Sequence, residues 1–408
     1  MRWNTIKLGE LVTIKHGYAF DGRFFSNSGK YVLLTPGNCY ERGGLKLHGE
    51  KERYYVGDVP DEYLLHAGDL LVVMTDLVNT APILGGAFLI PEDDRYLHNQ
   101  RLGLVETVDP SLIDKSFLYY LLNSYEYRAQ VRGSASGATV RHTAPKRIQN
   151  CIVRLPLNTE DQAKIAQTLI AYDSSIENNW RRIALLEQAA RHLYEEWFGR
   201  FRFPGHERVK MSDGLPKGWH RKPACDCMDI LSGGTPKTDN SGFWDGKIPF
   251  FTPKDAEPSV FVFDTEKHLT ERGLKACNSH LYSENTLLIT ARGTVGKMNL
   301  LGRPMAMNQS CYALIAYTPL SQEFLYFAMS FGVKELRSQA GGAVFDAIVR
   351  DTFKFISVVV PSEEIVQRFT VTVHPYLMST ANLQAQIRSL QKARDLLLPR
   401  LMSGEVEV

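Results

Sequence analysis

Two stretches of the sequence carry basic residues without any acidic ones. Residues 127–159 contain no Asp or Glu, and several arginines there surround a centre of small residues, GSASGAT. Residues 285–322 are also free of acids and include the turn sequence TARGTVGK. Loops of small residues flanked by cations can approach a phosphate backbone closely and donate backbone N–H groups to it. We therefore interpret both stretches as nucleic-acid contacts, and a solvated basic face is the alternative.

An Asn-Gln pair occurs in each half of the chain and could read base edges. The first half has Asn99-Gln100 followed by Arg101, and the second half has Asn308-Gln309. Asn and Gln side chains pair with adenine and Arg pairs with guanine, although a turn-stabilising pair explains these residues at least as well. The predicted DNA-contacting residues are Thr75, Asn99, Gln100, Arg101, Arg132, Arg141, Lys146, Lys237, Lys254, Arg292, Thr294, Lys297, Asn308 and Gln309.

Motifs of the common enzyme classes are absent from the sequence. There is no GxxxxGK[ST] nucleotide loop, no HExxH zinc-protease motif and no GxSxG hydrolase motif. A methyltransferase's Gly-rich cofactor loop and Asn/Asp-Pro-Pro-aromatic turn are missing as well. The six cysteines show no zinc spacing, so we predict no metal site. These absences favour a binding protein without catalytic residues over an unrecognised enzyme.

Charge and hydropathy limit the class of protein further. The formal net charge is only +2, so the argument for nucleic-acid binding rests on the local basic stretches. The first residues lack the basic start and apolar run of a signal peptide. No apolar stretch approaches the roughly 20 residues that cross a bilayer. We expect a cytoplasmic protein that does not enter a membrane.

Two long helical segments are predicted to position the basic loops. Apolar residues recur through residues 159–198 in the alternating four-three spacing of helices that pack together, and residues 363–402 repeat the pattern at an offset of 204. About forty helical residues span roughly 60 Å, which favours a spacer over a core helix of one globular domain. The predicted packing and partner-docking residues are Ile165, Leu169, Ile176, Ile183, Leu186, Leu193, Trp197, Phe369, Val373, Leu383, Ile387, Leu390, Leu397 and Leu401.

A few residues on these helices depart from the packing pattern. Asn179 is a polar residue in the apolar series, and such an Asn usually fixes helix register and partner number. Pro375 is expected to kink or interrupt the second helix. Four further apolar residues lie outside the series and are expected to face a protein partner: Ile170, Leu185, Tyr194 and Leu396.

The globular parts are duplicated as well. Gly17 aligns with Gly233 at an offset of 216, residues 70–73 align with residues 286–289 at the same offset, and the Asn-Gln pairs align at 209. Short β-branched runs between Gly, Pro and Asn clusters predict mixed, strand-rich units. The predicted organisation is a globular domain at 1–157, a helix at 158–200, a linker at 201–218, a second globular domain at 219–361 and a helix at 362–408.

The order of several short motifs resembles the specificity (S) subunit of type I restriction–modification systems. The second half contains GGTPK, FWDGKIPFFTPKD, ITARGTVGK and MNQS, followed by a helix ending in DLLLPRLMSGEV, and the halves are joined by WFGRFRFPG and LPKGW. The resemblance implies an α+β fold with two tandem mixed α/β target recognition domains, each followed by a long helix. The two helices would pack as an antiparallel coiled-coil spacer with pseudo-twofold symmetry.

The resemblance also implies a function, partners and cofactors. Each recognition domain would read one half of a bipartite, asymmetric sequence in double-stranded DNA. The helices would dock two modification (methyltransferase) subunits, which carry S-adenosylmethionine and methylate adenine, and two restriction (endonuclease/translocase) subunits using ATP and Mg would join through them. This chain would hold no cofactor. The alternatives are the specificity subunit of a methylation-only or phage-defence system without a restriction subunit, and a coiled-coil adaptor that binds proteins and no DNA.

Overall fold

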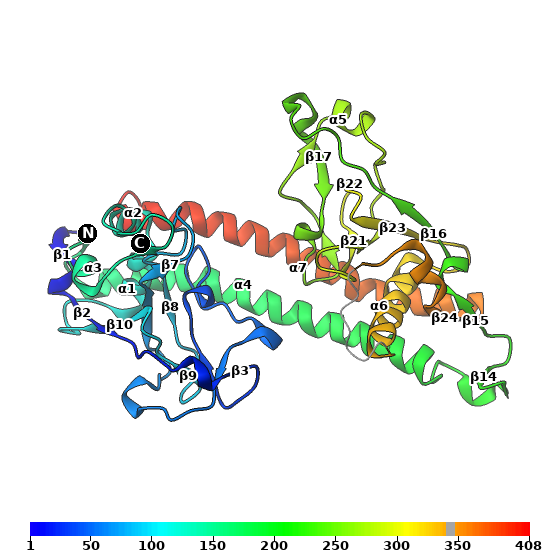
Figure 1. The fold of residues 1–408 in the computed structure, drawn as a ribbon, viewed down its shortest axis with the longest axis horizontal. Helices are drawn as coiled ribbons and strands as arrows, with labels where there is room; N and C mark the ends of the chain where they lie inside the picture. The colour runs from blue at the N-terminus through cyan, green and yellow to red at the C-terminus, as the bar shows by residue number, and fades with distance from the viewer. Residues whose placement is uncertain (340–346) are drawn as a thin grey trace. The chain divides into compact units, whose positions relative to one another are not determined.

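The computed structural model describes residues 1–339 and 347–408, which divide into two compact units (Figure 1). Unit 1 comprises Met1–Ser175 and Ser389–Val408, and unit 2 comprises Ile176–Arg388. Each unit therefore contains one globular part and a segment of both long helices, α4 (Thr159–Tyr194) and α7 (Glu363–Ser403). Residues 340–346, within the second predicted globular domain, lie outside the described residues. Because the units share the helices, the predicted domain boundaries stay predictions.

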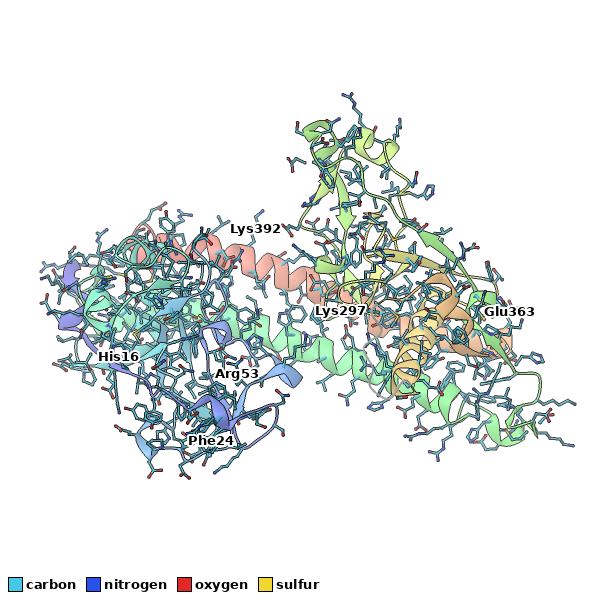
Figure 2. All side chains as sticks on the ribbon, viewed as in Figure 1. His16, Phe24, Arg53, Lys297, Glu363 and Lys392 are labelled. Carbon is cyan, nitrogen blue, oxygen red and sulfur yellow. The ribbon has the colours of Figure 1, made fainter. Side chains whose placement is uncertain are left out.

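The globular part of unit 1 is built on two four-stranded sheets. The first is antiparallel throughout, and the second ends in a parallel pair, with Phe24 and Arg53 beside it in Figure 2. In order across each sheet, the strands are β2 (Val12–His16), β10 (Leu102–Thr107), β6 (Leu70–Val73) and β8 (Ala87–Leu89), then β3 (Phe25–Ser26), β5 (Tyr54–Tyr55), β4 (Tyr31–Leu33) and β9 (Tyr96–Leu97). Two further pairs are β1 (Trp3–Lys7) with β12 (Ile152–Pro156), and β7 (Thr75–Asp76) with β11 (Arg141–His142).

Capping side chains set where two of the three short helices of unit 1 begin. The Asp114 carboxylate accepts a hydrogen bond from Phe117 N at 2.8 Å, and the Ser124 hydroxyl accepts one from Tyr127 N at 3.4 Å. Such bonds satisfy backbone N–H groups that have no partner within the helix. They start two consecutive helices. The apolar faces of these helices pack on the sheet β2-β10-β6-β8, which is the main sheet of unit 1. The helices are α1 (Lys115–Leu122), α2 (Tyr125–Gly133) and the short α3 (Pro145–Gln149).

The globular part of unit 2 repeats the order of the main sheet with one strand added, and its second sheet has three strands where that of unit 1 has four. Its main sheet has the order β16 (Met228–Ser232), β23 (Cys311–Ala316), β20 (Leu287–Thr290), β21 (Met298–Leu301) and β18 (Phe261–Val262). A smaller sheet has β19 (His268–Leu269), β17 (Trp244–Phe251) and β22 (Ala306–Met307), and two pairs are β15 (His220–Pro223) with β24 (Ser357–Val360) and β13 (Met211–Ser212) with β14 (Leu215–Pro216). The helices are α5 (Glu271–Lys275) and α6 (Gln322–Gln339).

Strand register corrects the predicted alignment of the two halves by one residue. In unit 1 Val73 pairs with Leu102, and in unit 2 Thr290 pairs with Cys311. Since the β10 and β23 strands align at an offset of 209, β6 aligns with β20 at 217 rather than 216. The apolar run in each strand is uniform, so sequence matching could not distinguish the two registers. Consequently Met74 corresponds to Ala291, and Thr75 corresponds to Arg292.

The long helices are part of each unit's hydrophobic core. In unit 1, Ile165, Leu169 and Leu401 are buried together with Phe117 and Val72. In unit 2, the Phe369 ring lies 5.9 Å from the Trp197 ring and 6.3 Å from the Phe324 ring. The predicted packing residues are therefore buried or half-buried, but many contact the globular parts as well as the other helix.

The two helices run antiparallel within each unit. In unit 1, Asp173 of α4 pairs with Arg394 of α7 at 2.5 Å, and Leu169 shares its cluster with Leu401. In unit 2, Asn179 donates to Gln386 at 3.3 Å, while Trp197 at the far end of its segment contacts Phe369. The predicted fold class, with tandem mixed domains each followed by a long helix, is confirmed.

Two predictions about the helices need correction. The helix α7 continues from Glu363 to Ser403 through Pro375, so the proline does not interrupt it, and a kink there stays a prediction. Tyr194 does not face a partner, because it is only 6% exposed and its ring lies 5.1 Å from that of Phe331. The predicted linker also has packed residues, since Phe203 and Leu215 are buried in the core of unit 2. Among the described residues, no helix is long and apolar enough to cross a bilayer.

Candidate nucleic-acid interface

Three segments of unit 1 meet at the carboxyl end of β6. Met74 follows this strand, and its N–H donates to the Arg101 carbonyl at 3.0 Å. The Met74 carbonyl accepts from the Thr143 N–H at 2.9 Å. The turn after β6, the Asn-Gln turn and the segment from the basic stretch are therefore held together by backbone bonds. We call this meeting point, defined by Met74, Arg101 and Thr143, the strand-end junction of unit 1.

Unit 2 contains the same junction. Ala291 follows β20, its N–H donates to the Ser310 carbonyl at 2.7 Å, and its carbonyl accepts from the Ile348 N–H at 2.8 Å. These residues are the counterparts of Met74, Arg101 and Thr143. The backbone of the junction is therefore kept in both units, while the side chains on it differ.

The Asn residues of the two Asn-Gln pairs shape the turns that carry them. Asn99 Oδ1 accepts from Arg101 N at 3.2 Å, and Asn308 Oδ1 accepts from Ser310 N at 3.0 Å. Such side-chain-to-backbone bonds are the usual way in which Asn stabilises a turn. The geometry favours the turn-stabilising interpretation of the Asn residues. The neighbouring Gln100 and Gln309 are exposed, and Gln309 accepts a hydrogen bond from the Thr235 hydroxyl.

A glycine permits the close packing beneath each turn. A Cβ on Gly17 would lie 2.2 Å from the Asn99 carbonyl oxygen, and one on Gly233 would lie 2.3 Å from that of Met307. Real Cβ atoms do not approach a carbonyl oxygen so closely, so both positions require glycine. This constraint explains why the glycines align between the two halves.

Two candidate residues in unit 1 are engaged inside the protein. Thr75 is buried, and its hydroxyl lies 3.1 Å from Nδ1 of His142. The Arg141 guanidinium donates to the carbonyls of Arg132 at 3.1 Å and Gly137 at 3.2 Å, which closes the Gly- and Ser-rich loop. These bonds give both residues a structural task at the junction, and a role for either in DNA contact stays a prediction.

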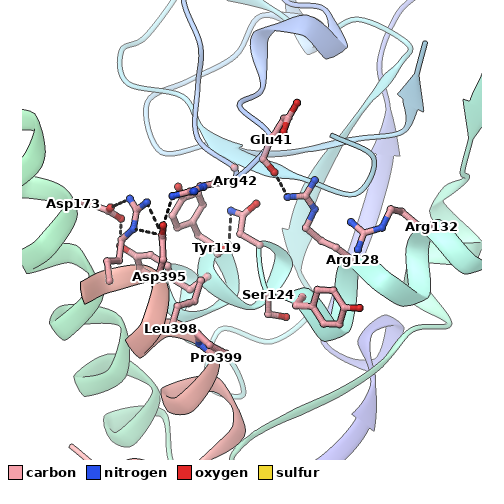
Figure 3. Close-up of a pocket in the computed structure, with 15 residues that line it drawn as sticks. Glu41, Arg42, Tyr119, Ser124, Arg128, Arg132, Asp173, Asp395, Leu398 and Pro399 are labelled. Atoms are coloured by element: carbon pink, nitrogen blue, oxygen red, sulfur yellow. Dashed lines mark hydrogen bonds and ion pairs between the residues drawn. The ribbon is translucent and has the colours of Figure 1, made fainter. Parts of the chain in front are cut away.

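Arg132 and Lys146 belong to the helices next to the junction. The Arg132 side chain lies over the Tyr125 ring, with 6.0 Å from guanidinium carbon to ring centroid, and it lines a cavity of about 410 Å³ (Figure 3). Lys146 is exposed on α3. Neither makes a side-chain hydrogen bond or ion pair to the junction among the described residues.

The cavity of Figure 3 is lined mainly by groups that fasten the parts of unit 1 together. Arg128 is buried there and donates to the carbonyls of Glu41 and Pro82. Burial lowers the pKa of its guanidinium. On the other side Arg394 pairs with Asp173 at 2.5 Å and with Asp395 at 3.0 Å. Of the predicted DNA-contacting residues, only Arg132 lines this cavity.

The candidate residues of unit 2 surround one tight turn between β20 and β21. The Thr290 hydroxyl accepts from Lys297 N at 3.0 Å, and the Thr294 hydroxyl donates to the Pro253 carbonyl at 3.1 Å. The second bond brings the turn beside Lys254. Lys297 ends the turn and is drawn in Figure 2.

Arg292 lies at the tip of this turn and is exposed. Gly293 beside it has a φ of +78°, which favours glycine. In the part of the chain that the structure describes, no hydrogen bond or ion pair holds the Arg292 guanidinium. Lys237 is exposed two residues after Thr235, which is bonded to Gln309. Cations and amide groups of unit 2 thus gather on the side of the strand-end junction.

Several exposed residues at the junctions were missed by sequence reasoning. Leu77 and Val78 follow Thr75 in unit 1, His142 contacts Thr75, and Thr235 bonds Gln309 in unit 2. None belongs to a recognisable motif, and only the strand pairing brings them to the junction. No group of three or more metal-ligating side chains occurs within residues 1–339 and 347–408.

Two copies of one mixed domain, each presenting loops at a strand-end junction and joined to long helices, define a tandem recognition protein. The chain belongs to the family of the type I restriction modification DNA specificity domain, whose family model matches residues 1–188 and 216–389. The predicted family is therefore confirmed. Members of this family confer sequence specificity in type I restriction–modification.

Individual relatives support this assignment. The chain is 27% identical to the type I restriction enzyme MjaIX specificity subunit of Methanocaldococcus jannaschii over 302 residues, which cover 72% of this chain and 69% of the relative. It is 25% identical to the HindI specificity subunit of Haemophilus influenzae, covering 79% and 84%. A crystal structure of a type I S subunit from M. genitalium shares the fold, with a TM-score of 0.59 at 16% identity over 98% of this chain and 96% of that one.

Proposed function

We propose that this chain is the specificity subunit of a type I restriction–modification complex and reads a bipartite, asymmetric sequence in double-stranded DNA. The observation that carries the proposal is the strand-end junction, which recurs with the same backbone bonds in both units. Two DNA-reading sites that are related but recognise different bases require the same backbone structure with different side chains on it. The position of Arg101 in unit 1, for example, is held by Ser310 in unit 2.

The exposed cations of unit 2 suit a DNA backbone. Arg292, Lys254 and Lys237 are all exposed beside the same turn and the adjacent loops. Lys and Arg neutralise phosphates, and their contacts make DNA affinity fall steeply as salt rises. An adaptor that binds only proteins predicts no such salt-dependent affinity for DNA.

The long helices are proposed to dock two adenine methyltransferase subunits, which would carry S-adenosylmethionine. Both helices have large apolar side chains in solvent, and exposed apolar groups on a folded protein mark interaction sites when they cluster. Ile170, Leu185 and Leu396 are exposed. The chain itself would be non-catalytic, and restriction subunits using ATP and Mg would join through the methyltransferase. Whether the system encodes a restriction subunit distinguishes this proposal from a methylation-only system.

The proposal is tested with the purified complex of this chain and its methyltransferase. The complex should bind a duplex carrying its methylated sequence, with affinity that falls steeply with salt. Absence of sequence-specific binding by an assembled complex would refute DNA reading.

Docking is tested separately through one exposed leucine. Leu185→Glu on α4 should weaken association with the methyltransferase, because it puts a charge into an apolar contact. Leu281→Glu, at an exposed leucine of the globular part of unit 2, is the matched control and should leave association unchanged. Equal association of both variants would exclude this part of α4 as a docking site.

A further inference from the structure

The loop that follows β7 in unit 1 presents two adjacent apolar side chains to solvent. Leu77 is 64% exposed and Val78 is 50% exposed. The main sheet and α1 of unit 1 bury many leucines and valines, so this pair is not part of the core. Single exposed apolar residues are common on proteins. Two adjacent exposed apolar side chains at a candidate DNA-reading site indicate that they contact a binding partner.

The loop is fixed at both ends, so the exposed pair is held in place. Asp76 is only 2% exposed, and its carboxylate accepts from Val78 N at 3.0 Å and from Ile83 N at 2.8 Å. At the far end of the loop, buried Arg128 donates to the Pro82 carbonyl. These side-chain-to-backbone bonds fix the loop backbone at Val78, Pro82 and Ile83. A preformed loop also loses little conformational freedom when it binds.

The loop lies at the end of a two-stranded ribbon. In this ribbon Asp76 of β7 pairs with Arg141 of β11, and Thr75 pairs with His142. Because the strands are antiparallel, Leu77 lies at the same end of the ribbon as the turn at 137–140, which precedes Arg141. The major groove of DNA admits a two-stranded ribbon of this kind. The ribbon starts at the strand-end junction, next to exposed Arg101.

The corresponding loop in unit 2 has a different chemistry. Strand register sets the offset of 217 at the junction, so Thr75 corresponds to Arg292, but the loop that follows in unit 1 is longer than the turn in unit 2. The turn in unit 2 presents exposed Arg292 and Thr294, with Val295 half-buried, and its exposed tip suits phosphates or guanine. The tip in unit 1 is apolar, and the apolar group that base pairs display in the major groove is the C5-methyl of thymine.

We propose that Leu77 and Val78 are specificity-determining residues, which contact thymine methyl groups in the part of the target read by unit 1. The inference rests on the proposed function, because it assumes that unit 1 reads DNA. It adds the chemical feature that this unit recognises. A protein surface, such as that of the methyltransferase, is the competing occupant of the loop.

The test replaces thymine by deoxyuridine, which removes only the methyl group. The complex of the full chain with its methyltransferase is bound to duplexes of its own target in which each thymine is replaced in turn. Loss of one buried methyl group weakens binding about four-fold. The wild-type complex should show this loss at one or more thymines of one part of the target. The L77A/V78A complex should bind the thymine duplex more weakly and show no further loss with deoxyuridine.

A matched control uses two residues of the same types at the other end of β10. Val108 is 56% exposed and Leu112 is 48% exposed, and V108A/L112A should keep the wild-type response to deoxyuridine. An undiminished deoxyuridine effect in L77A/V78A, or no effect at any thymine with wild type, would overturn the inference while leaving DNA reading intact. Loss of methyltransferase association in L77A/V78A would assign the loop to a protein contact instead. If the complex binds no duplex in a sequence-specific way, both the proposed function and this inference are refuted.

Discussion

Arg292→Ala should weaken DNA binding without weakening the fold of unit 2. The guanidinium is exposed at the tip of the turn between β20 and β21, and no described residue bonds to it. Substitutions at such surface positions change the free energy of unfolding by less than about 0.5 kcal/mol. One lost phosphate contact should make the slope of log affinity against log salt shallower by about 0.9. Between about 50 mM and about 200 mM salt, the affinity ratio of wild type to variant should therefore shrink about 3.5-fold.

The assay is equilibrium binding of the assembled complex to its target duplex across this salt range. A base contact by Arg292 would instead leave the slope unchanged and relax discrimination at one base pair, at a cost of about 1–3 kcal/mol. Arg303→Ala is the control, since Arg303 is an exposed arginine of the same acid-free stretch, between β21 and β22. Wild-type slope and discrimination in Arg292→Ala, or an equal loss in Arg303→Ala, would refute the assignment of this turn to DNA.

Three further perturbations test the scaffold. Asp173→Asn removes a carboxylate that accepts from the Tyr120 hydroxyl at 2.7 Å and from Arg394 at 2.5 Å, and it should lower the free energy of unfolding of unit 1 by about 2 kcal/mol in chemical denaturation. Burial lowers the pKa of His98 to about 4, so the unfolded chain binds more protons between pH 4 and 6.5; stability should be full at pH 7 and fall by about 3 kcal/mol as pH drops through this window. Deleting four residues, about one helical turn, within 176–190 should change the gap between the two parts of the methylated sequence and not their bases.

Each of these perturbations has a control and a contrary outcome. Asp239→Asn, at an exposed carboxylate, should leave the free energy of unfolding unchanged. An equal loss of stability in both Asn variants would show that the Asp173 contacts do not stabilise unit 1. His98→Gln should flatten the decline of the melting midpoint between pH 7 and pH 4, and an unchanged decline would assign the pH dependence to other groups. A deletion that altered the bases and kept the gap would disprove the spacer role of the helices.

Much of the fold was predictable because it rests on repeated patterns. Heptad spacing locates both long helices, since helix packing requires an apolar residue at every third or fourth position. The pattern does not reveal what each apolar residue packs against. Phe369 fits the heptad series, yet its ring packs among aromatic residues that include Tyr194 of α4 and Phe324 of α6. Tyr194 was assigned to the surface for the same reason, because periodicity along one helix gives no information about the domain beside it.

The candidate site was less predictable because its residues are far apart in the sequence. Met74, Arg101 and Thr143 become neighbours only through strand pairing, and the uniform apolar run of β6 hides the one-residue shift between the halves. Composition favoured Arg141 and Asn99 as DNA contacts. The structure gives both of them bonds to the backbone, which is a local task that residue type alone cannot reveal.

Each unit is proposed to read its own part of one DNA sequence. The most direct measurement is sequencing that detects methylated adenines in DNA from cells producing the methyltransferase with wild-type chain, with Arg292→Ala or with L77A/V78A. The wild-type chain should give a bipartite methylated motif with an unread gap. Arg292→Ala should weaken or relax methylation through one part of the motif, and L77A/V78A should do so through the other. A continuous motif, or two variants that affect the same part of the motif, would contradict the proposal that the two units read separate parts of the target.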